Sequence, residues 1–222
     1  MGFGLLFFGF MMMLDTGWTI NEAYSIGLDI FPDILGYLCM YRSMKHLRKS
    51  SRDLNIFAWI TAALSVLGGV LLVGQITAAV MRFAYPAGLE GAGLFIMICG
   101  YIKNPIMLAA VLFLTSGLRT LANSLELYPL AKKTTVVSVV SSVYYLLQSA
   151  FTITSMGNIS VPSVVFYGTA LLFYVQLIMI LALIFSYYRQ VGYEGEDTSA
   201  KEHPLEKLRK RLMKAGKDEE DD

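Results

Sequence analysis

The sequence predicts an all-α integral membrane protein, a bundle of six transmembrane helices with both termini in the cytoplasm. Three observations carry this prediction. Hydrophobic residues make up 55% of the 222-residue chain and charged residues only 16%, against about 25% charged residues in a typical soluble domain. The hydrophobic residues are gathered in long runs. The basic residues are gathered in every second segment between those runs.

Each apolar run can be compared with the length of a spanning helix, about 20 residues. Four runs reach that length: Leu54–Met81, Gly91–Leu118, Thr134–Thr154 and Ser163–Tyr188. The two runs before them, Met1–Leu14 and Ile26–Tyr41, are slightly short. Either they span by recruiting flanking residues, or they form a re-entrant hairpin beside four spans. Re-entrant backbone is tolerated only where protein or a cavity covers it.

The orientation follows from the excess of lysine and arginine in cytoplasmic loops. The segment Arg42–Asp53 holds five of these basic residues and the segment Arg119–Lys133 holds three, whereas the loops of the other set hold only Arg82. We therefore expect the two basic segments and both termini to face the cytoplasm. The orientation is the same for six spans and for four spans with a re-entrant hairpin.

The chain divides into a transmembrane bundle, residues 1–190, and a cytoplasmic tail, residues 191–222. Within the tail, residues 204–215 would place three leucines on one face of an amphipathic helix, and an acidic end follows. Such a helix is drawn to an anionic lipid surface; the alternative is a solvated tail. The basic residues expected at the membrane surface are Lys207, Arg209, Lys210, Arg211 and Lys214.

Three full charges, Asp29, Asp33 and Lys103, lie inside the apolar runs. A charge at the centre of a bilayer costs at least about 2.5–3.5 kcal/mol, so such residues point to function. Asp29 and Asp33 are four residues apart and are expected on one face of a helix. Pro32, between them, removes a backbone donor and can break that helix.

A similar interruption is expected where Lys103 is followed by Asn104 and Pro105. Unwound backbone beside charged side chains is how many transporters form ion or substrate sites. Counting from the outer helix ends places Lys103 and Asp33 at matching depths, so we expect an ion pair between Lys103 and Asp33 or Asp29. This pair either pins two helices together or belongs to a ligand or ion site of Asp29, Asp33, Lys103 and Asn104, reached through a polar cavity.

The ionisable residues leave an enzyme activity open without favouring it. Intramembrane aspartic proteases place one aspartate on each of two helices with a Gly-x-Gly-Asp motif, which this chain lacks. His46 and His203 lie in basic segments outside the apolar runs, so neither a Ser–His pair nor a zinc site is expected in the membrane. No Gly-rich phosphate loop is present. We expect no catalytic residue, no metal, no cofactor and no nucleic-acid partner.

The segment Asp29–Tyr37, with Gly2–Phe10 before it and Met44–Leu47 after it, resembles the N-terminal hairpin of multi-spanning membrane proteins of Gram-positive bacteria. Those proteins share an Asp-x-x-Pro-Asp-x-x-Gly-Tyr segment that ends in a basic loop. The resemblance covers about the first 50 residues. It implies the cytoplasmic membrane of a bacterium and no assigned activity. The size and span count are also similar to substrate-binding subunits of energy-coupling-factor vitamin transporters, whose motifs this chain lacks.

Two functions of different classes fit these observations. The first is a small-solute or ion transporter, or its membrane subunit, with a mid-membrane site of Asp29, Asp33 and Lys103. The second is an accessory or envelope-sensing protein that docks a membrane partner, with the Asp–Lys pair as a structural link and the tail as the docking element. The expected partners are the lipid bilayer, a small solute or cation, and another membrane subunit.

Overall fold

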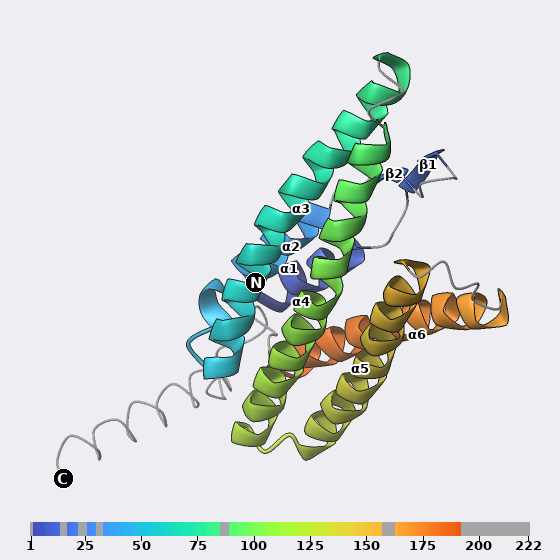
Figure 1. The fold of residues 1–222 in the computed structure, drawn as a ribbon. Helices are drawn as coiled ribbons and strands as arrows, with labels where there is room; N and C mark the ends of the chain where they lie inside the picture. Colours follow the sequence, from blue (N-terminus) through green and yellow to red (C-terminus); the bar gives the residue numbers. More distant parts are fainter. Residues whose placement is uncertain are drawn as a thin grey trace, which may run out of the picture.

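The computed structural model describes residues 2–13, 17–21, 26–29, 33–84, 89–156 and 163–191. Within these residues the chain forms six α-helices and one β-hairpin (Figure 1). The helices are α1 (Gly2–Met11), α2 (Asp33–Leu47), α3 (Arg52–Ala84), α4 (Leu89–Ser124), α5 (Tyr128–Met156) and α6 (Ser163–Val191). The strands are β1 (Gly17–Asn21) and β2 (Ile26–Asp29), which pair antiparallel.

The four long helices are the four spans that the sequence predicts. Their membrane-length segments are Arg52–Met81, Leu94–Ser124, Tyr128–Phe151 and Tyr167–Val191. Many of their large apolar side chains point outward, as a lipid-facing surface requires; Val66, Leu171 and Ile178 are each more than half exposed. Four apolar helices of this length indicate an integral membrane protein.

The two N-terminal helices are too short to cross a membrane by themselves. They have 10 and 15 residues, about 15 and 22 Å at the rise of an α-helix, against a hydrocarbon core of about 30 Å. A continuous helix over Ile26–Tyr41 was the wrong expectation, because Ile26–Asp29 is a strand. Gly27 and Pro32 both oppose a helix in this stretch. The described residues thus form six helices, of which four are of spanning length, so the expectation of six transmembrane helices is supported for these four only.

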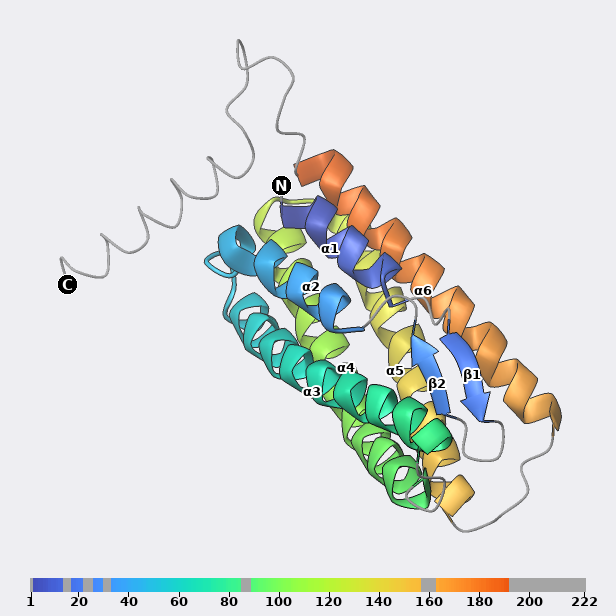
Figure 2. The same cartoon turned by 90° about the horizontal axis from the view of Figure 1, so that it is seen from above.

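The six helices close a ring. Each helix packs against the next one in the chain, and α6 packs back against α1; Figure 2 shows α1 lying between α2 and α6. At this closure the rings of Phe3 and Tyr187 stack with their centroids 5.9 Å apart. Strand β2 lies against α3. The interior is filled by large buried side chains, among them Phe10, Tyr37, Phe57, Leu114 and Tyr187.

Two glycines bring α1 and α2 into close contact. A Cβ atom built on Gly9 would lie 2.8 Å from the carbonyl oxygen of Gly36, and one built on Gly36 would lie 2.8 Å from that of Gly9. Small residues are what allow helix backbones to approach this closely in a membrane. Gly4, on the same helix, would place a Cβ in open space, with no atom within 4 Å.

We expect Gly9→Ala to destabilise the protein by about 1–3 kcal/mol, because the new methyl group must push α1 and α2 apart. The measurement is thermal unfolding in detergent. Gly4→Ala is the matched control on the same helix and should be as stable as the unchanged protein or more stable by up to about 1 kcal/mol, because alanine favours a helix over glycine. Equal melting temperatures for both variants would contradict this α1–α2 contact.

The connection between α4 and α5 is much shorter than the predicted loop Arg119–Lys133. Helix α4 continues to Ser124 and α5 begins at Tyr128. The turn between them is closed by a hydrogen bond from the Leu127 N–H to the Ala122 carbonyl, 2.8 Å, with Glu126 at a left-handed φ of 62°. Sequence hydropathy places the loop boundaries at the ends of the apolar runs. Both helices extend beyond those ends, so the loop is shorter than predicted.

Candidate functional site

The charges of Asp33 and Lys103 meet inside the ring. Asp33 is the first residue of α2, and its Oδ2 accepts a hydrogen bond from Lys103 Nζ on α4, with which it forms an ion pair. The ion pair that the sequence predicts is therefore present. The two side chains are 16% and 27% exposed respectively, so the pair is not sealed from its surroundings.

The pair lies near the middle of the bundle. A Cβ built on Gly68 would come within 3.2 Å of the backbone nitrogen of Ile34, and Gly68 is close to the midpoint of the span Arg52–Met81. The first turn of α2, with Asp33, is therefore at mid-span depth. Helices α2 and α4 are not consecutive in the ring, so their ion pair crosses its interior.

The position of Asp33 at the start of α2 has a local reason. The first N–H groups of a helix have no partner within the helix, and the aligned peptide dipoles make this end positive. A carboxylate in the first turn is stabilised there by about 0.3–1 kcal/mol at an exposed site. Asp33 is thus held between the positive end of its own helix and the Lys103 ammonium group.

The expectation that Asp29 and Asp33 share one helix face is wrong. Asp29 is the last residue of β2, paired with Gly17 in the hairpin, and Asp33 begins the next helix. A proline directly before the first helical residue suits a helix start, because the missing N–H would have had no partner there. Pro32 itself lies outside the described residues.

The expected interruption of the helix at Asn104 and Pro105 is also absent from the structure. Helix α4 runs without a break from Leu89 to Ser124, with Pro105 inside it. Neighbouring helices can compensate for a proline in a membrane helix, and α4 packs against α3 and α5. Asn104 is half-buried beside Lys103 on this continuous helix.

Tyrosines from two helices, α2 and α5, lie near the ion pair, and sequence reasoning missed them. The side chain of Tyr145 on α5 lies within electrostatic range of Asp33, Lys103 and Tyr37. Tyr37 lies one turn after Asp33 on α2 and is buried. The rings of Tyr144 and Tyr145 meet edge to face, 4.9 Å between centroids. The only sequence signal was the Tyr-Tyr pair inside an otherwise apolar run.

A separate cavity of about 390 Å³, with a mixed polar and apolar lining, lies between α4, α5 and the Asp53 end of α3. Its lining has one acid, one base, five hydroxyl side chains and three apolar ones: Asp53, Arg119, Thr115, Ser116, Thr134, Thr135, Ser138, Leu112, Phe113 and Val139. The Ser116 hydroxyl donates a hydrogen bond to the Asp53 carboxylate. Sequence reasoning missed this cavity because its lining comes from three helices.

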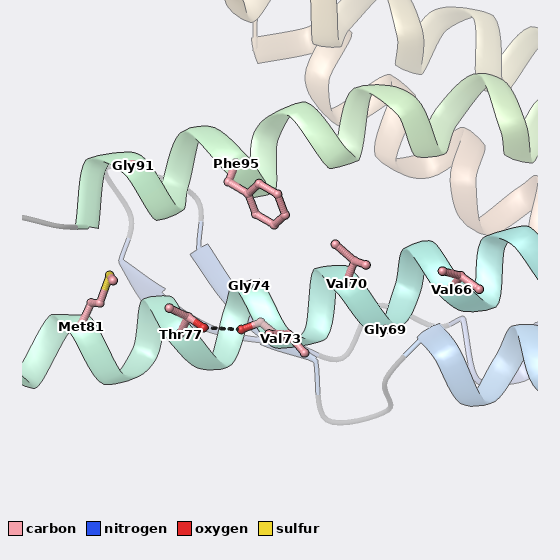
Figure 3. Close-up of a pocket in the computed structure, with 9 residues that line it drawn as sticks. All are labelled: Val66, Gly69, Val70, Val73, Gly74, Thr77, Met81, Gly91 and Phe95. Atoms are coloured by element: carbon pink, nitrogen blue, oxygen red, sulfur yellow. Dashed lines mark hydrogen bonds between the residues drawn. The ribbon is translucent and has the colours of Figure 1, made fainter.

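A larger groove of about 800 Å³ lies between α3 and α4, toward their other ends (Figure 3). Its lining is almost wholly apolar: Val66, Gly69, Val70, Val73, Gly74, Thr77, Met81, Gly91 and Phe95. In Figure 3, Phe95 of α4 and Val70 of α3 point into the groove from opposite sides. The Thr77 hydroxyl donates to the Val73 carbonyl, 2.8 Å away. The groove therefore suits hydrocarbon and not a charged solute.

Neither of these two cavities is lined by Asp33 or Lys103. No three His, Cys, Asp or Glu side chains gather as a metal site would require, among the residues that the structure describes. The tail residues Lys207, Arg209, Lys210, Arg211 and Lys214 lie outside the described residues. Comparison of the chain with protein-family models, with curated proteins and with solved structures gave no match.

Proposed function

We propose that the protein is a membrane transporter of a small solute or ion, or the membrane subunit of one, with Asp33 and Lys103 as its central site. The observation that carries this proposal is their ion pair at mid-span, which joins two non-consecutive helices and remains partly exposed. A buried structural link would be sealed by packing. A charge pair that can be reached offers Asp33 to a cation and Lys103 to an anion.

At such a site the Asp33 carboxylate would exchange its ion-pair partner, Lys103, for the solute. A cationic group that reaches Asp33 takes the place of the Lys103 ammonium group, and Lys103 must then find another partner. The Tyr37 and Tyr145 side chains lie within electrostatic range and can accept a hydrogen bond from it. Because the ion pair links α2 to α4, its exchange would couple binding to the relative position of these helices.

We further propose that α1, the β-hairpin and α2 form a re-entrant unit within a bundle of four spans. In the hairpin each strand pairs one edge with the other strand, and β2 lies against α3; cover by protein is what non-helical backbone at membrane depth requires. The excess of basic residues supports an orientation with both termini and the segment Arg42–Asp53 in the cytoplasm. The basic tail would then lie at the inner surface of a bacterial cytoplasmic membrane.

The test uses purified protein in liposomes adsorbed on a solid-supported membrane. Transient currents are recorded after jumps in Na⁺, K⁺, H⁺, protonated amines and carboxylates. We expect a current for at least one of these solutes with the unchanged protein. The double variant Asp33→Asn with Lys103→Met should show none, because it lacks both charges while keeping the site neutral. An unchanged current in the folded double variant would refute Asp33 and Lys103 as the central site.

The second candidate is the accessory protein that docks a membrane partner. The observation favouring it is that Asp33 and Lys103 neutralise each other and line neither of the two cavities. In that case the pair only fixes the register of α2 and α4. The absence of currents for every solute, from protein that melts cooperatively in the same liposomes, would favour this candidate over the transporter.

A further inference from the structure

Helix α5 carries a polar face that leads from the 390 Å³ cavity toward the central ion pair. Thr134, Ser138, Ser141 and Tyr145 follow one another at spacings of four, three and four residues, which places them on one side of a helix. Thr134, Ser141 and Tyr145 are buried and Ser138 is half-buried. The opposite side of α5 carries Val136 and Val143, which are 54% and 46% exposed. We call the four residues the polar face of α5.

The two ends of the polar face belong to the two polar sites. Thr134 and Ser138 line the cavity, and Ser138 lies 3.1 Å from Thr115 of α4 through their hydroxyl oxygens. Tyr145 lies within electrostatic range of Asp33 and Lys103. Seven residues separate Ser138 from Tyr145, about 10 Å along a helix. The cavity thus ends about two turns of α5 short of the central site.

Ser141 occupies the interval between the two sites. Its side chain is completely buried, and its hydroxyl oxygen has no hydrogen-bond partner among the described residues. A serine in a membrane helix ordinarily bonds to a carbonyl one turn earlier, as Thr134 and Thr115 do here. An orphaned buried hydroxyl is costly, about 1–3 kcal/mol. It calls for a polar occupant in this interval.

The hydroxyl groups beside the cavity offer acceptors. Thr115 can give its proton to the Val111 carbonyl, 2.8 Å away, and its oxygen also lies 3.1 Å from the Ser138 hydroxyl. Thr134 lies 2.9 Å from both the Leu130 carbonyl and the Tyr187 hydroxyl. A hydroxyl has one proton and two lone pairs, so at least one lone pair on each oxygen remains for a ligand. The Asp53 carboxylate adds a negative charge. Oxygen acceptors and a carboxylate are the ligands of a small cation and of water. Arg119, which also lines the cavity, is exposed and has no hydrogen-bond or ion-pair partner among the described residues.

We propose that the cavity and the polar face of α5 form a cytoplasmic access route for water and a small cation to the Asp33–Lys103 site, closed in this structure at Ser141. This inference rests on the proposed function, because it takes Asp33 and Lys103 to be the site that the solute reaches. It adds the side from which the site is reached, the residues that line the route and the charge of the solute.

The test is the reactivity of single cysteines toward a membrane-impermeant, cationic methanethiosulfonate reagent, applied to inside-out vesicles. In a background with Cys39→Ala and Cys99→Ala, the variants are Ser138→Cys and Ser141→Cys. Val136→Cys and Val143→Cys are the matched controls on the lipid-facing side of α5. A thiol reacts as its thiolate, which forms in water and not in hydrocarbon. We expect both serine positions to react at least about tenfold faster than the valine positions.

If the cysteine of Ser138→Cys reacts and that of Ser141→Cys does not, the cavity ends at Ser138 and the proposed route is overturned. So would equal rates at Ser141→Cys and Val143→Cys. The cation preference is tested with an anionic sulfonate reagent at Ser138→Cys, which should react more slowly than the cationic one, and Asp53→Asn should reduce this difference. A faster anionic reagent would overturn the cation assignment. Melting temperatures and labelling after denaturation verify that each variant folds and carries its thiol.

These outcomes are independent of the transport test. Labelling of the polar face requires only water in the route, whereas the currents require the charges of Asp33 and Lys103. A labelled route with no current for any solute would overturn the transporter and leave the route standing. Currents without labelling of Ser141→Cys would overturn the route and leave the transporter standing.

Discussion

Lys103→Met is expected to destabilise the protein by up to about 3–5 kcal/mol, which is the cost of leaving one charge alone when a fully buried ion pair is broken; the partial exposure of this pair lowers that cost. Lys103 bonds to Asp33 at mid-span depth, so the carboxylate that remains would lie in the interior without its ammonium partner. The measurement is unfolding in detergent by denaturant and by heat. Lys45→Met is the control, because Lys45 on α2 is exposed and exposed substitutions usually change stability by less than about 0.5 kcal/mol.

The double variant Lys103→Met with Asp33→Asn should recover much of that loss, because it removes both charges together. The two single losses should therefore exceed the loss in the double variant by well over about 1 kcal/mol in a double-mutant cycle. Simple additivity would mean that the two charges do not interact. This cycle also supplies the folded, neutral variant on which the transport test depends.

Labelling of introduced cysteines is expected to give a nearly all-or-none contrast between the two sides of the membrane. Cysteines at Ser50 and Asn123, in a background without Cys39 and Cys99, should resist an impermeant thiol reagent in intact cells. A cysteine at Asn158 should react. The reason is the bias of lysine and arginine toward the segments that hold Ser50 and Asn123, since such segments are retained in the cytoplasm.

Permeabilised cells are the control for this experiment, because all three cysteines should then be labelled. Reaction at Ser50 together with protection at Asn158 in intact cells would reverse the proposed orientation. Reaction at Ser50 with protection at Asn123 would mean an odd number of crossings between them, whereas α3 and α4 supply two.

Several features could be predicted from the sequence because they depend on local composition. The length of an apolar run decides whether a helix can span, and all four long helices followed from that. The Lys103–Asp33 pair was predictable as well, because a charge at mid-membrane depth needs a partner and only a few residues could supply one. The α4–α5 connection was predicted in the right place but too long, because hydropathy marks the membrane boundary and not the end of a helix.

The tertiary structure decided what depends on more than one helix. Asp29 and Asp33 are four residues apart, which on one helix would put them on the same face. In the structure Asp29 belongs to a paired strand of the β-hairpin and only Asp33 belongs to a helix. The cavity of Asp53, Arg119 and Ser138 comes from three helices whose rotation about their axes is set by packing. The polar face of α5 could be read from residue spacing, but its direction could not. Hydropathy is a property of each segment by itself, whereas the meeting of side chains is a property of how the segments pack.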